Sequence, residues 1–121
     1  DYTSRGRWAQ NVNFLGAAQA NFAACMAENN ALARCNTFAA LGVTNGVNAG
    51  VLTLPSGTAT IGVNAATATQ LDMVMTSAAN ASACTVTMSI NTALNPMQWV
   101  VANGGGGNGT TPCTNAQSGY N

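Results

Sequence analysis

Four cysteines are the residues of this chain best suited to chemistry, and they lie at Cys25, Cys35, Cys84 and Cys113. Cysteines of this kind form disulfides, stay free in a core, or together hold a zinc ion. Zinc sites usually include two ligands a few residues apart, whereas the separations here are 10, 49 and 29 residues. An even number of cysteines in a small, lysine-free chain of 121 residues favours two disulfides in an oxidising compartment.

Groups for acid–base or nucleophilic catalysis are scarce. The chain has no histidine, and its three carboxylates, Asp1, Glu28 and Asp72, fall on different expected elements. Serine, threonine and cysteine nucleophiles lack a basic partner other than arginine. The glycine-rich run GGGGNG lacks the Lys-Ser/Thr of a phosphate-binding loop. We therefore expect no catalytic residues, no cofactor and no metal site, and interpret the chain as non-enzymatic.

The charge of the chain is low and balanced. Only 5% of its residues are charged, and the arginines Arg5, Arg7 and Arg34 bring the formal net charge to zero. Nucleic-acid binding needs a cluster of cations, so we expect no strong binding of this kind. A neutral surface gives little repulsion and tolerates self-association. The sequence has no apolar run of membrane-spanning length and no cleavable signal, which is typical of a chain whose front end has been removed.

Residues 1–30 have helical periodicity. One stripe of this helix has residues at intervals of three and four, and we expect it to be the helix–sheet packing and assembly face. Gln19 is its polar member, and its apolar residues are Trp8, Val12, Leu15, Phe22 and Met26. An alternative for the residues nearest the start, Trp8 especially, is that they protrude from the domain and contact neighbouring subunits instead of the sheet. The opposite face is rich in alanine and uncharged, which suits either close approach by another helix or simply high helix propensity. If Cys25 pairs with Cys35, the helix must end near Asn29 and Asn30.

The rest of the chain predicts strands of an α+β domain. Residues 31–69 contain turn signals and short apolar alternations, so we expect a loop region with one or two short strands. Residues 70–121 contain three alternating segments, which predict an antiparallel meander whose inner face packs on the helix. The expected inner residues are Leu71, Met73, Met75, Val86, Met88 and Ile90.

The C-terminal tail is rich in glycine, asparagine and threonine. Cys113 would close it into a surface loop if it paired with Cys84. Asn80-Ala-Ser82 and Asn108-Gly-Thr110 match the glycosylation acceptor pattern, which arises easily by chance in an asparagine-rich chain.

Four stretches, in their order along the chain, resemble the type IV pilins. DYTSRGRWAQNV resembles the segment that follows the hydrophobic N-terminal part of a pilin, and LARCNTFAALGV resembles the junction after its helix. The run from TATQLDMVM to NPMQWVV resembles the pilin sheet, and PCTNAQSGYN resembles the C-terminal disulfide region. The resemblance covers the whole chain and implies a single domain over residues 1–121. Its pilin fold would be one long helix on an antiparallel sheet of about four strands, with a disulfide-closed C-terminal loop.

The resemblance also implies a disulfide pairing and an origin for the helix. We expect Cys25–Cys35 and Cys84–Cys113, against two other connectivities. Many pilins have only the C-terminal disulfide, and many place a cysteine just after the strand tryptophan, where this chain has Val101. In the family, the helix continues upstream into an apolar segment that anchors the subunit in the inner membrane. On this comparison, the chain is a trimmed, soluble pilin head.

The implied function is that of a structural subunit of a bacterial type IV pilus, which polymerises with other pilin subunits into a filament on the cell surface. Such filaments serve adhesion, twitching motility or DNA uptake. One alternative is a minor pilin that acts as a binding module, such as a DNA receptor. Another is a type II secretion pseudopilin, although the acidic calcium ligands common in pseudopilins have no counterpart in residues 73–121.

Overall fold

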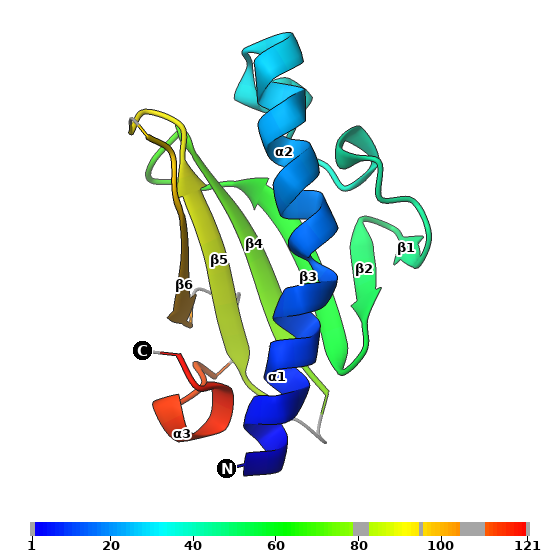
Figure 1. Ribbon diagram of the computed structural model, residues 1–121, viewed down its shortest axis with the longest axis vertical. Coiled ribbons are helices and arrows are strands. Elements are labelled where there is room, and N and C mark those ends of the chain that lie inside the picture. The colour runs from blue at the N-terminus through cyan, green and yellow to red at the C-terminus, as the bar shows by residue number, and fades with distance from the viewer. Residues whose placement is uncertain (1, 79–82, 95, 105–110, 121) are drawn as a thin grey trace.

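A long helix lies across one face of a six-stranded antiparallel sheet, so the α+β prediction is confirmed (Figure 1). The computed structural model describes residues 2–78, 83–94, 96–104 and 111–120. The helix consists of α1 (Tyr2–Phe14) and α2 (Gly16–Asn29). The strands are β1 (Val47–Asn48), β2 (Val51–Leu54), β3 (Gly57–Val63), β4 (Gln70–Ser77), β5 (Thr85–Asn91) and β6 (Trp99–Asn103). Their order in the sheet follows the chain.

The two helical parts form nearly one rod, interrupted only at Leu15. The amide of Leu15 donates to the carbonyl of Val12 at 3.2 Å, a tighter turn than the α-helix makes, and the Leu15 carbonyl accepts from Gln19 at 3.0 Å. The helix ends at Asn30, which adopts the left-handed conformation with φ of 50° and donates to the Met26 carbonyl. The end near Asn29 and Asn30 is therefore as expected.

The prediction of about four strands is wrong, because the region expected to be mainly loop contributes three. Two short 3₁₀ helices, η1 (Leu32–Arg34) and η2 (Ala39–Leu41), precede β1, and β3 pairs with β4 along its whole length. The alternation in β3 is hard to recognise because Ala59, the fully buried residue of this strand, is small. A strand that is paired on both edges gains its hydrogen bonds from its neighbours, so it needs little apolar area of its own.

A tight turn joins β2 to β3 and brings Gly57 against β4. A Cβ atom at Gly57 would lie 2.2 Å from the carbonyl oxygen of Thr76, which no L-residue tolerates. Glycine is therefore required at this position for the close approach of the two strands.

The strands expected in the second half of the chain form, with one difference. Leu71, Met73, Met75, Val86 and Met88 are fully buried against the helix, and Ile90 is nearly so. However, the start of β5 is buried on both faces rather than one. The reason is the C-terminal segment, because Thr85 donates its amide to the Thr111 carbonyl and forms a bridge with Pro112.

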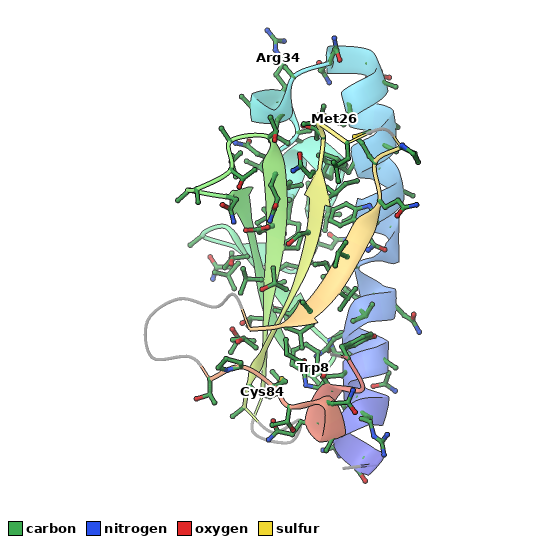
Figure 2. All side chains as sticks on the ribbon, turned by 90° about the vertical axis from the view of Figure 1, so that its left-hand side faces the viewer. Trp8, Met26, Arg34 and Cys84 are labelled. Carbon is green, nitrogen blue, oxygen red and sulfur yellow. A yellow bond between two sulfur atoms is a disulfide. The ribbon has the colours of Figure 1, made fainter. Side chains whose placement is uncertain are left out.

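The two disulfides lie at opposite ends of the sheet. Cys25 is joined to Cys35 near the end of α2, next to Arg34, and Cys84 is joined to Cys113 at the end where Trp8 lies (Figure 2). The pairs are those that the pilin resemblance implies. Disulfides indicate an oxidising, non-cytoplasmic compartment. The helix α3 (Asn115–Ser118) follows Cys113 and packs on α1 (Figure 1).

Several expectations fall on residues that the structure does not describe. Both glycosylation patterns, Asn80–Ser82 and Asn108–Thr110, lie outside the described residues. So do residues 105–110 of the glycine-rich run, which we expect Cys113 to hold at an exposed edge.

Candidate assembly surface

The expected packing face of the helix meets the sheet, although its five residues are not equally buried. Trp8, Leu15 and Phe22 are fully buried, and Val12 and Met26 are partly buried against the same core. Trp8 does not protrude, since α3 and the segment around Cys84 surround the same end of α1 (Figures 1 and 2).

The buried stripe of the helix differs from the expected one at every second position. It runs at spacings of four and three through Ser4, Trp8, Asn11, Leu15, Ala18, Phe22 and Cys25. Val12, Gln19 and Met26 flank this stripe, and the amide of Gln19 donates to the sulfur of Met88 at 3.3 Å. Periodicity alone does not decide between neighbouring positions that are both compatible with one face. Val12 and Met26 pack against the core, but they are less buried than Asn11 and Cys25.

Asn11 is a structural residue that the sequence analysis missed. Its side chain is fully buried, donates Nδ2 to the carbonyl of Ser56 at 3.1 Å, and accepts the Ser56 amide on Oδ1 at 2.8 Å. These two bonds hold the β2–β3 turn against α1. A signal was present in the sequence: Asn11 stands three residues after Trp8 and four before Leu15, where a buried position recurs.

Asn11→Ala should lower the free energy of unfolding by about 2 kcal/mol. A buried donor left without a partner costs about 1–3 kcal/mol. The change leaves the Ser56 amide unpaired, whereas the Ser56 carbonyl keeps its hydrogen bond from the Ala78 amide at 3.0 Å. Urea unfolding measures the loss, and Asn13→Ala, on the exposed face of the same helix, is the control. Equal losses of stability from the two substitutions would contradict the conclusion that Asn11 holds the β2–β3 turn against α1.

The outward face of the helix is exposed, uncharged and formed by small or amide side chains. Its members recur at spacings of four and three, which are the spacings of a helix–helix seam. They are Gly6, Gln10, Asn13, Ala17, Ala20, Ala24 and Ala27. Small residues let two backbones approach closely.

Phe14 stands beside this face and borders a groove. The ring is 49% exposed, in a chain where the other phenylalanines are buried. The groove has a volume of about 320 Å³ and lies between Phe14 and Ala17 on one side and residues 42–45 on the other. A second groove of about 260 Å³ runs on along α2, and Gly42 borders both. The residues that line the first groove are uncharged, and Glu28 is the charged residue among those that line the second.

A separate apolar surface lies where the end of α2 meets the β5–β6 connection. Leu94 is 58% exposed, and Met97 is also exposed. A groove of about 520 Å³ separates Leu94, Pro96 and Met97 from Ala23, Met26 and Ala27 on the helix.

The outer face of the sheet is mainly polar, with Val100 exposed on β6 and Asp72 as its charged residue. The carboxylate of Asp72 accepts hydrogen bonds from Gln70 and Ser89 on one oxygen and from Asn64 on the other, each at 2.8 Å. Among the described residues, no group of three or more cysteine or acidic side chains is placed to hold a metal ion. In the same part of the chain, no helix is both long and apolar enough to cross a membrane.

Tyr120 links the stability of the fold to high pH. Its carbonyl accepts the side-chain amide of Asn103 at 2.6 Å, and burial raises the pKa of its phenol above the ordinary value of 10.0. A raised folded-state pKa means that stability is fully present below about pH 10 and is lost as the pH rises through the folded value. We expect Tyr120→Phe to lessen this loss in urea titrations above about pH 10. An unchanged pH profile in the variant would contradict the assignment.

Comparison with known proteins adds no assignment. No family model matches the chain. No curated protein matches it. No solved structure matches it.

Proposed function

We propose that this chain is a structural subunit of a bacterial type IV pilus and assembles with further copies of itself through the outward face of its helix. The observation that carries the proposal is this face, a stripe of exposed small and amide side chains with Phe14 beside it. A solvent-facing helix normally has Glu–Lys pairs at these positions. In α2, the single acidic residue is Glu28, near the end of the helix.

The remaining features agree with a filament subunit. Two disulfides close the two ends of the sheet, which suits a protein that must last outside the cell. The arginines do not form one basic surface, since Arg34 lies at the end opposite Trp8 and therefore far from Arg5 and Arg7 on α1 (Figure 2). This separation argues against a DNA-receptor role. When two different surfaces of a subunit bind each other and the repeated rotation does not close into a ring, the product is a helical filament.

Complementation tests the proposal. The whole gene, expressed in a strain that lacks its pilin, should restore surface filaments seen by electron microscopy. Absence of filaments from a host with a working pilus machinery, despite stable protein, would contradict the pilus function.

A charge placed on the helix face tests the surface separately. Ala20→Glu should reduce filament number by more than about tenfold, because burying an unpaired charge costs several kcal/mol. Thr60→Glu, an equally exposed position on the outer face of the sheet, is the matched control and should assemble. Equal thermal melts would show that both variants fold. If Ala20→Glu assembled as well as the unmodified protein, the helix face would not be the assembly surface.

A further inference from the structure

Two Asn-Gly pairs of the chain lie in very different surroundings. A third, Asn108–Gly109, is outside the described residues. Asn103 is held by two side-chain bonds: Nδ2 donates to the Tyr120 carbonyl at 2.6 Å, and Oδ1 accepts from the Ser118 hydroxyl at 2.6 Å. The following amide, that of Gly104, is buried and donates to the Thr85 carbonyl at 3.0 Å. Every group that could react at this pair is therefore occupied.

Asn45 and Gly46 are exposed, and their reactive groups are unoccupied. Within the described part of the chain, neither the Asn45 side-chain amide nor the Gly46 backbone N–H has a hydrogen-bond partner. Both residues lie in the centre of a turn that is closed by one long bond, from the Val47 amide to the Thr44 carbonyl at 3.4 Å. Gly46 has a φ of +80° and carries no side chain of its own that could shield its nitrogen.

We propose that Asn45–Gly46 is a site of self-catalysed deamidation. The Gly46 nitrogen gives its proton to hydroxide and attacks Cγ of Asn45; the Cγ–Nδ2 bond breaks, and the nitrogen leaves as ammonia after taking a proton from water. The resulting five-membered succinimide then adds one water molecule. Cleavage of the bond from Cγ to the Gly46 nitrogen gives aspartate, whereas cleavage at the main-chain carbonyl gives isoaspartate. No oxidant or reductant is involved.

Deamidation would place a new carboxylate at residue 45. Asn45 lines the groove that Phe14 and Ala17 border on the helix, so the new charge would lie in this uncharged depression. The formal net charge of the chain would change from 0 to about −1, which increases repulsion between copies. The modification itself does not depend on the proposed pilus function, but on that function it would weaken assembly of aged subunits.

Peptide mapping by mass spectrometry tests the inference without any assembly assay. The folded, oxidised protein and a reduced, unfolded sample are kept in the same mildly alkaline buffer, and conversion at the two sites is followed over time. In the folded protein, Asn45 should convert at least about tenfold faster than Asn103, because hydrogen bonds protect only the latter. In the unfolded chain, the two sites should convert at similar rates. Equal rates in the folded protein, or an intact Asn45 in the folded protein that converts only after unfolding, would overturn the proposal.

Discussion

Phe22→Ala should lower the free energy of unfolding by about 3–5 kcal/mol, as truncation of a buried phenylalanine does in other cores. Phe22 is fully buried in α2, and its ring meets that of Trp99 edge to face, with centroids 5.7 Å apart and planes at 71°. The substitution removes this aromatic pair and leaves a cavity between the helix and the β6 edge of the sheet. Urea unfolding of the oxidised protein measures the loss.

Phe14→Ala is the matched control, since it removes the same side chain from the same rod of helix. Phe14 is half-exposed, so its truncation should change stability by about 1 kcal/mol or less. On the proposed function, it should instead reduce filament assembly. A comparable loss of stability in both variants would show that the division between the inner and outer helix faces is wrong.

Removal of the Cys84–Cys113 disulfide, as the double alanine variant, should cost about 3–4 kcal/mol. The bond closes 29 residues, and the chain-entropy model assigns this cost to a loop of that length. Both sulfurs are buried, and the bond fixes the segment that covers the start of β5 and leads into α3. Chemical unfolding should therefore begin at a lower denaturant concentration, with loss of the tail packing on α1.

The Cys25–Cys35 disulfide supplies the comparison. It closes only 10 residues, so its removal should cost less, about 2.5–3 kcal/mol on the same model. We therefore expect removal of Cys84–Cys113 to lower the stability more than removal of Cys25–Cys35. A larger loss from Cys25–Cys35 would mean that the helix end, and not the tail, is the part of the fold that most needs a covalent bond.

The helix and the central strands could be predicted from the sequence because their large apolar residues repeat with a clear period. Leu71, Met73 and Met75 alternate without exception, and β4 forms as expected. The pattern also indicated the end of the helix, where Asn30 can adopt the left-handed conformation that most residues avoid. These features depend on local chemistry that a single stretch of sequence contains.

The sequence indicated one or two short strands in residues 31–69, but it did not indicate β1, the full length of β3 or the hydrogen bonds between Asn11 and Ser56. β3 is stabilised mainly by pairing with β4, and its buried Ala59 gives a weak hydrophobic signal. Asn11 looked like a surface residue, and only the folded chain brings Ser56, which lies 45 residues further on, against its amide. The helical period marks position 11 as one that can be buried, but nothing in either segment identifies Ser56 as its partner.

The outer face of the helix was visible in the sequence but ambiguous, because an alanine-rich face suits both close packing and high helix propensity. The structure resolves which residues form it and adds the half-exposed Phe14 and its groove.

A cryo-electron microscopy map of filaments from cells that express the whole gene most directly tests whether subunits assemble through the outward face of the helix. If subunits assemble through the outward face of the helix, neighbouring subunits should cover Ala17, Ala20, Ala24 and the ring of Phe14. The sheet face around Asp72 should remain at the outer surface of the filament. A filament in which the alanine face of α2 meets solvent and subunits contact one another through the Asp72 face would contradict this mode of assembly.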